Sequence, residues 1–236
     1  MHIKHKMVRE SMATVTYSDN ILIRKYDSRD RKALEDICCD TAYFGEPCDF
    51  FFSDRRLLAD LTIKYYLDYE PEHIWVAEYK NEAVGYVSAC LDESRLSRIM
   101  PFKIIPFVFL KALIRGEIWS KRTGRLIVYN LKCFLSKEAV LQKIDRKKFP
   151  VYIHQNIKKE FRGRGIGSRL VMALLDEVEE QKLPGIRFRA LRQEPRFLFF
   201  EKFGFKQIDC KRVKSWETWL KKKPLYFMEY GKEFYV

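Results

Sequence analysis

Three glycines and three arginines stand within ten residues, FRGRGIGSRL, at positions 161–170. An apolar, strand-like stretch precedes them and a strongly helical stretch follows. Glycine adopts left-handed backbone angles and lets amide groups approach a ligand closely. The first N–H groups of the following helix lack partners within the helix, and its positive dipole end favours an anion. The pattern therefore predicts phosphate binding, with Arg162 and Arg164 as charged donors for a pyrophosphate.

Three phosphate-binding patterns compete for this loop. A dinucleotide-binding turn requires G-x-G-x-x-G early in the chain and an acidic residue about 20 positions later, and neither the glycine spacing nor the location fits. A nucleoside-triphosphate loop requires Gly-Lys-Ser/Thr at its end, and the sequence lacks it. The third pattern, Arg162-x-x-Gly165-x-Gly167 at a late strand-to-helix junction, is the one that the sequence contains.

The elements that must position this loop follow from hydrophobic periodicity, which predicts one mixed α/β domain over residues 21–236. Alternating or β-branched stretches predict strands at 21–26, 73–79, 83–91, 149–157, 185–191, 205–213 and 225–234. Apolar residues at helical spacing predict helices after residue 28, at 54–68, at 165–181 and, as a short helix, within 195–203. The polar residues 1–20 are expected to be an N-terminal tail.

The composition favours a soluble globular protein, because 47% of the residues are hydrophobic and the longest apolar run carries lysines and a proline. No secretory signal is recognisable at the start. The six cysteines show no CxxC pairing and the four histidines no metal-ligand spacing. We therefore expect no metal site, and buried free thiols in a reducing cytoplasm.

Positive charge is concentrated between the predicted third and fourth strands. Residues 94–150 hold 14 lysines and arginines against three acids, which makes +11 of the chain's total of +13. Apolar residues at helical spacing predict two or three amphipathic helices with a basic outer face, inserted at about 94–149. A lid or a homodimer element is the favoured interpretation. A membrane surface is less favoured, and a nucleic acid is disfavoured because no recognised nucleic-acid motif is present.

Several segments together resemble a known family. Arg162-x-x-Gly165-x-Gly167, the long helix after it and the segment FLFFEKFGF resemble the acetyl-CoA-binding half of the GCN5-related N-acetyltransferase (GNAT) superfamily. The stretches AYFGEPCDFFFSD, YYLDYEPEHIWVAE, VGYVSACLD and HQNI are similar to the acetyltransferase-like domain of O-GlcNAc hydrolases and its bacterial stand-alone relatives. The resemblance implies a mixed, mostly antiparallel sheet of about seven strands, flanked by helices, with the fourth and fifth strands splayed apart.

The resemblance also implies a site for acetyl-CoA. Backbone groups of Gln155, Asn156 and Ile157 would pair with the pantetheine amides, as an added strand does. The pyrophosphate would lie on the loop formed by Arg162, Gly163, Arg164, Gly165, Ile166, Gly167 and Ser168. Gln193 stands where the family often has a cofactor-contacting Asn. Phe200 stands where it often has a Tyr that protonates the departing thiolate.

The expected reaction is direct transfer of acetyl from CoA to an amine acceptor that the sequence does not identify. His154, on the strand before the loop, is the candidate base because its neutral form is available near pH 7. It could equally be a structural histidine. Asp68, Tyr69, Glu70 and Tyr152 are weaker candidates for the acceptor side. Because Phe200 has no proton to give, the alternative is an acetyl-CoA-binding interaction module with little or no catalysis.

Overall fold

The computed structural model describes residues 20–141 and 144–234, so the expected tail, apart from residue 20, lies outside it. The described part contains one seven-stranded sheet in the order β1-β2-β3-β4-β5-β7-β6. The strands are β1 (Ile21–Lys25), β2 (Ile74–Tyr79), β3 (Glu82–Cys90), β4 (Val151–Ile157), β5 (Gly185–Arg192), β6 (Lys206–Arg212) and β7 (Tyr226–Glu233). All seven lie where the sequence predicts strands.

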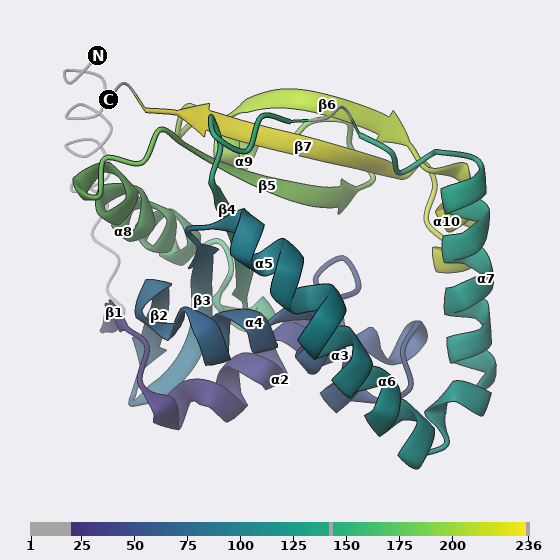
Figure 1. The fold of residues 1–236 in the computed structure, drawn as a ribbon. Helices are drawn as coiled ribbons and strands as arrows, with labels where there is room; N and C mark the ends of the chain where they lie inside the picture. Colours follow the sequence, from purple (N-terminus) through teal and green to yellow (C-terminus); the bar gives the residue numbers. More distant parts are fainter. Residues whose placement is uncertain (1–19, 142–143, 235–236) are drawn as a thin grey trace.

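Helices cover the sheet and extend beyond it (Figure 1). The α-helices are α2 (Arg31–Thr41), α3 (Arg55–Thr62), α4 (Lys64–Tyr69), α5 (Glu93–Ile99), α6 (Ile105–Ile114), α7 (Lys121–Leu135), α8 (Ile166–Glu180), α9 (Leu198–Glu201) and α10 (Lys214–Leu220). Short 3₁₀ turns connect several of them, and a π-helical turn, Met100–Ile104, joins α5 to α6.

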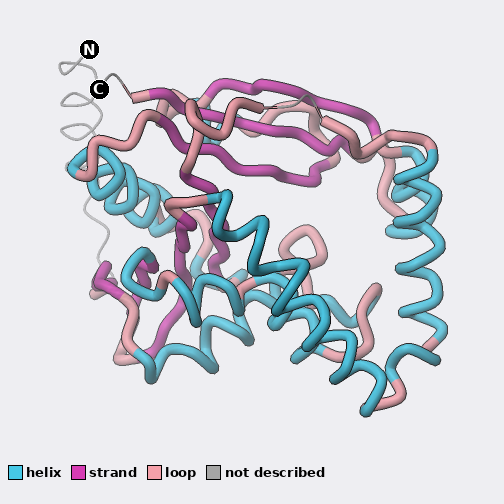
Figure 2. Tube along the Cα trace, in the orientation of Figure 1, coloured by secondary structure: helices cyan, strands magenta, loops and turns pink. Residues whose placement is uncertain are grey.

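The sheet is antiparallel except where β4 meets β5. Strands β1 to β4 form one group and β5 to β7 another, and Figure 2 shows β4 as the link between them. This is the mixed, mostly antiparallel arrangement that the resemblance implied, with flanking helices and one parallel pair at its centre.

Two apolar cores form on the two faces of the sheet. Helix α8 packs on β1 to β4, and its buried stripe meets the aromatic residues around Phe188 and Phe200. Helices α2, α3 and α4 cover the opposite face, where Leu34, Ile37 and Ile74 are fully enclosed. Five of the six cysteines are buried and all six are free thiols.

The chain between β3 and β4 forms helices, as the periodicity predicted. Helices α5 and α6 and the π-helical turn run as one long rod across the molecule, and α7 stands beside α10 at its edge (Figure 1). The lysines and arginines of this segment were expected to face solvent, and nearly all that the structure describes are exposed. Lys111 is half-buried, and Lys111 and Arg115 pair with Asp60 and Asp54, at 2.7 and 2.6 Å.

Two further differences have local causes. The helix predicted at 54–68 is divided at Ile63, next to Thr62, whose hydroxyl donates to the Leu58 carbonyl at 2.8 Å. Such back-bonding by threonine competes with the helical ladder and bends helices. Helix α10 was not predicted. It is held by Glu217, whose carboxylate accepts hydrogen bonds from Arg212 and from the backbone amide of Leu225.

Candidate functional site

The central strands separate just before the glycine loop. β4 pairs with β5 at two positions, Val151 with Ile186 and Tyr152 with Arg187. On its other edge, β4 stays paired with β3 as far as Ile157. The β5-facing edge of β4 beyond Tyr152 therefore has no strand partner among the described residues. Unpaired backbone groups beside a sheet are a place where an extended amide-containing ligand can add itself as a strand.

The glycine loop joins this open edge to the start of α8. Gly163 and Gly165 have φ values of +76° and +74°, in the left-handed region that favours glycine. Gly165 is the N-cap of α8 and brings no capping side chain to the first amides of the helix. A Cβ placed on Gly163 would meet nothing within 4 Å. The loop thus combines an open approach with an uncapped helix N-terminus, which suits an anion.

Gly167 is required for packing. A Cβ at Gly167 would lie 3.2 Å from both Ile157 and Phe199, closer than side chains normally approach. The Gln155 side chain donates from Nε2 to the Gly167 carbonyl at 3.0 Å. The third glycine therefore lets α8 sit against β4 and the α9 segment.

The two arginines of the loop are already engaged. Arg162 donates from Nε to the Ile157 carbonyl at 3.0 Å. Its guanidinium packs so closely on Gly45 that a Cβ there would be 2.4 Å from Nη1. Arg164 lies over the ring of Phe161, 5.2 Å from its centroid. Arg162 thus anchors the loop to residues 43–46, in addition to whatever charge it offers a ligand.

The remaining predicted cofactor residues lie in three different settings. Ser168, in the first turn of α8, is buried and accepts a hydrogen bond from Lys202 at 3.0 Å. Gln193 follows β5, and its amide reaches the Lys223 carbonyl at 3.4 Å. Phe200 is buried in an aromatic cluster, with its ring centroid 4.1 Å from that of Phe188. These surroundings favour a packing role for Phe200.

His154 belongs to a polar cluster that the sequence did not reveal. Its Nδ1 lies 3.3 Å from the Tyr86 hydroxyl, and its Nε2 lies 3.3 Å from the Asn156 amide nitrogen. Asn156 also donates to the Tyr86 hydroxyl at 3.1 Å. The ring of Tyr66 stacks on the imidazole. The signal that could have found Tyr86 is strand register, because β3 pairs Tyr86 directly opposite Asn156.

Burial sets the protonation state of this cluster. It lowers the pKa of His154 from 6.5 to about 4, because a half-buried imidazole among apolar neighbours loses solvation when it is charged. Burial likewise raises the pKa values of Tyr66 and Tyr86 well above 10. At pH 7 all three groups are neutral. His154 can therefore offer a neutral nitrogen, but its low pKa makes it a weak acceptor of protons.

The other acceptor-side candidates are mostly occupied. Asp68 forms ion pairs with Lys64 and Arg31. Glu70 is buried and accepts hydrogen bonds from the Tyr65 hydroxyl and, at 2.7 Å, from the Leu91 amide. Tyr69 stacks on Tyr65. Tyr152 lies beside Arg187, whose guanidinium is 5.0 Å from its ring centroid.

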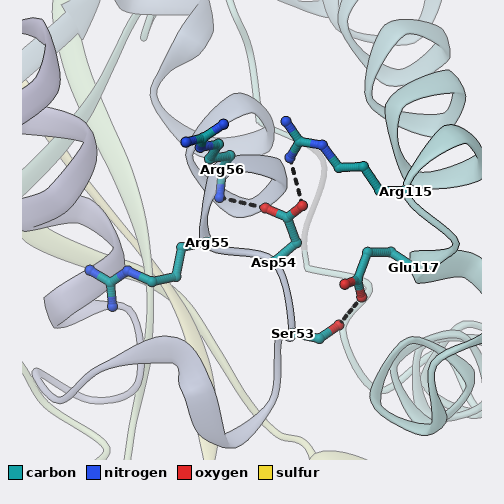
Figure 3. A pocket seen from close by; sticks show the side chains of 6 residues that line it. All are labelled: Ser53, Asp54, Arg55, Arg56, Arg115 and Glu117. Carbon is teal, nitrogen blue, oxygen red and sulfur yellow. Dashed lines mark hydrogen bonds and ion pairs between the residues drawn. The ribbon is translucent and has the colours of Figure 1, made fainter.

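A separate hollow of about 460 Å³ lies between the start of α3 and the turn after α6 (Figure 3). It is lined by Ser53, Asp54, Arg55, Arg56, Arg115 and Glu117. Several of these side chains satisfy one another: Arg115 pairs with Asp54, and Ser53 donates to Glu117. The lining belongs to the helical side of the molecule, so this hollow is distinct from the β4 edge and the glycine loop.

Residues 20–141 and 144–234 contain no cluster of metal-ligating side chains. Over the same residues, no helix has both the length and the apolar character to cross a membrane.

Comparison with known proteins agrees with this geometry. Residues 140–222, from just before β4 to the end of α10, match the family model of the acetyltransferase (GNAT) domain. No curated protein sequence matches the chain significantly. The match spans the open strand edge, the glycine loop, α8 and the aromatic cluster.

Solved structures share the fold over almost the whole chain. SsHAT is 22% identical with a TM-score of 0.64, and the superposition covers 90% of this chain and 98% of SsHAT. The Drosophila melanogaster polyamine N-acetyltransferase is 14% identical, with a TM-score of 0.53 and coverage of 91% and 100%. The Brucella melitensis ribosomal-protein-alanine N-acetyltransferase is 15% identical, with a TM-score of 0.51 and coverage of 90% and 99%. Residues 140–222 thus match a GNAT acetyltransferase domain, and the fold of the chain is shared with N-acetyltransferases of known structure.

Proposed function

We propose that this protein is an acetyl-CoA-dependent N-acetyltransferase that transfers acetyl directly to an amine. The observation that carries the proposal is the separation of β4 from β5 immediately before an open, uncapped glycine loop. A pantetheine arm has amides to pair with the free edge of β4, and a pyrophosphate suits the N-terminus of α8. The residues present therefore fit the cosubstrate.

The transfer forms a C–N bond at the thioester carbonyl as the C–S bond breaks, and the proton that the amine loses passes, directly or through water, to the departing CoA thiolate. Backbone N–H groups on the open edge of β4 would stabilise the negative charge that develops on the carbonyl oxygen. His154 would orient a neutral amine through the cluster it forms with Tyr86 and Asn156. Its low pKa makes this positioning role more suitable than general-base catalysis.

A binding module without catalysis is the second candidate. Phe200 favours it, because a buried aromatic core surrounds the position where many relatives carry a tyrosine hydroxyl. The free thiols, five of them buried, support the expectation of a reducing compartment such as the cytoplasm for either candidate.

Thiol release from acetyl-CoA separates the two candidates. The assay presents amines, amino sugars, polyamines and peptides in turn. Acceptor-dependent thiol release supports the enzyme. Tight acetyl-CoA binding by calorimetry without release for any acceptor supports the module, and no binding at all contradicts both.

A matched pair of variants tests the phosphate site itself. Gly163→Asp and Gly163→Asn introduce side chains of similar size into open space at the same left-handed position. Aspartate and asparagine both tolerate these angles better than most residues, so the strain is comparable. We expect the aspartate to weaken acetyl-CoA binding more than the asparagine, by about tenfold or more. Equal affinities of the two variants for acetyl-CoA would show that the pyrophosphate does not bind at this loop.

A further inference from the structure

Helix α7 exposes an apolar face from Ile127 to Leu135. Ile127, Leu131 and Phe134 recur at helical spacing, flanked by Val128 and Leu135, and all five side chains are exposed. The opposite side of the helix makes the contacts with the rest of the protein. There Cys133 is buried, and Tyr129 stacks on Trp219 with ring centroids 6.0 Å apart.

Helix α6 and the turns around it continue this exposure. Ile104 and Val108 point inward and are buried. On the outer side Phe109, Leu113 and Ile114 are exposed. Phe102 before α6 and Trp119 after it are 80% and 82% exposed. We call the exposed set the apolar helical face: Phe102, Ile105, Phe109, Leu110, Leu113, Ile114, Trp119, Ile127, Val128, Leu131, Phe134 and Leu135. Large exposed apolar patches of this kind mark interaction sites.

Lysines and arginines border the apolar helical face, and residues 94–137, which form it, contain almost no acidic residues. Residues 94–137 contain ten lysines and arginines and a single acid, Glu117. Lys121, Arg122, Arg125 and Lys132 on α7 are all exposed. Within the described part of the chain, none of these four forms an ion pair with a carboxylate. The positive charge of α7 is therefore not neutralised by ion pairs within the described residues, in contrast to that of Lys111 and Arg115.

We propose that the apolar helical face binds an anionic phospholipid surface. Amphipathic helices with aromatic and aliphatic residues on one side and lysines or arginines beside them lie in the headgroup region of such membranes. Anionic lipids supply the charge that this segment lacks. Since α6 and α7 have 10 and 15 residues, they would lie along the surface without crossing it.

Charge argues for lipid over a second copy of the chain. A symmetric dimer through the apolar helical face would bring two strongly basic segments together, and like charges across an interface oppose association. Two acids beside this segment, Asp54 and Asp60, are already paired with Arg115 and Lys111.

Vesicle flotation of the full chain tests the proposal. One set of vesicles is pure phosphatidylcholine, and in the other phosphatidylglycerol replaces part of it. We expect flotation with the anionic vesicles and little with the neutral ones, weakening as salt is added. The charge reversals Arg122→Glu and Arg125→Glu together should weaken binding by about a hundredfold or more. The double reversal Lys80→Glu and Lys206→Glu, which changes the net charge equally at exposed positions outside α6 and α7, should change binding less.

The apolar contribution is tested separately. Leu131→Glu and Leu22→Glu alter side chains with the same exposed fraction, 54%, on α7 and on β1. We expect the first to abolish flotation and the second to preserve it, with both variants retaining the native melting transition. Failure of the unaltered protein to float with anionic vesicles would overturn the proposal. So would a dimer, seen by light scattering, that Leu131→Glu dissociates.

Discussion

Helices α7 and α8 have the same length, 15 residues, and each carries one apolar side, but only the apolar side of α8 is buried. Leu170, Val171, Leu174, Leu175 and Val178 of α8 are all buried against the sheet. The corresponding stripe of α7 faces outward, and its narrower rear side holds the helix to α10. Apolar periodicity therefore shows that a helix has a side to cover, but not what covers it.

The two helices therefore represent two roles for apolar residues in this molecule. Around α8, the apolar contacts fix the glycine loop relative to β4, so their loss should cost stability and cofactor binding together. Along α7, the apolar residues contribute little to the fold and remain available for a partner. Substitutions at matched positions in the two regions test this distinction.

The largest difference is expected between Leu174→Ala and Leu131→Ala. Leu174 is 1% exposed in the core beneath the sheet, so its truncation leaves a cavity and should lower the free energy of unfolding by about 2–5 kcal/mol. Leu131→Ala should stay within about 0.5 kcal/mol. Urea denaturation of both variants measures the difference. A comparable loss at Leu131 would mean that the α7 stripe is part of the folded core.

Acid should lower the free energy of unfolding because of His154. Its pKa is about 4 in the folded protein and 6.5 without burial, so below pH 6.5 the unfolded chain takes up a proton that the folded chain does not. The free energy of unfolding should therefore fall between pH 6.5 and pH 4, by about 3 kcal/mol in total. His154→Gln should remove this part of the pH dependence, measured by urea denaturation at stepped pH. If the free energy of unfolding depended on pH in the same way in His154→Gln, burial would not be what lowers the pKa of His154.

Glu177 provides an internal reference for that experiment. Burial raises its pKa, but hydrogen bonds from His73, Lys25 and Trp75 outweigh burial and bring the pKa from 4.5 down to about 2. Its stabilising contribution should be lost as pH falls from 4.5 towards 2, below most of the His154 window. The two groups can therefore be told apart by pH.

A hydroxyl added to an aromatic ring should be tolerated in one region and not in the other. Phe200→Tyr places a polar group within the ring cluster of α9 and β5, and should cost about 1–3 kcal/mol if the hydroxyl finds no partner. Phe134→Tyr, at an exposed position of α7, should cost less than about 0.5 kcal/mol. Thermal melting measures both. If Phe200→Tyr instead keeps its stability and speeds thiol release, the position faces the thiolate.

The smallest effect concerns the ion pairs that hold α6. Lys111→Met removes the pairing with Asp60, which is partly exposed, and should cost about 0.2–1 kcal/mol. Lys32→Met, in the more exposed pair with Asp36, should have less effect. Melting at low and high salt measures both. A clearly larger loss for Lys111→Met would make this pair a principal anchor of the helical segment.

The sequence predicted the strands and α8 well because their signals are local: alternation, helical spacing and a glycine-rich turn. The polar cluster around His154 was missed because Tyr86 and Tyr66 approach it from β3 and α4, through register and packing. Arg162 was assigned to a ligand by its charge and by the family motif. Its contact with Gly45 depends on a loop more than a hundred residues earlier, which the motif does not include.

The hydrogen bond from Gln155 to the Gly167 carbonyl ties the open strand edge to the first turn of α8. Gln155 is also the neighbour of His154 on β4. The strand expected to hold the acyl arm and the turn expected to hold the phosphates are thus linked by this side-chain amide, just as Arg162 links the glycine loop to β4. A change in the turn that breaks the Gln155 hydrogen bond would therefore reach β4 at the residue next to His154.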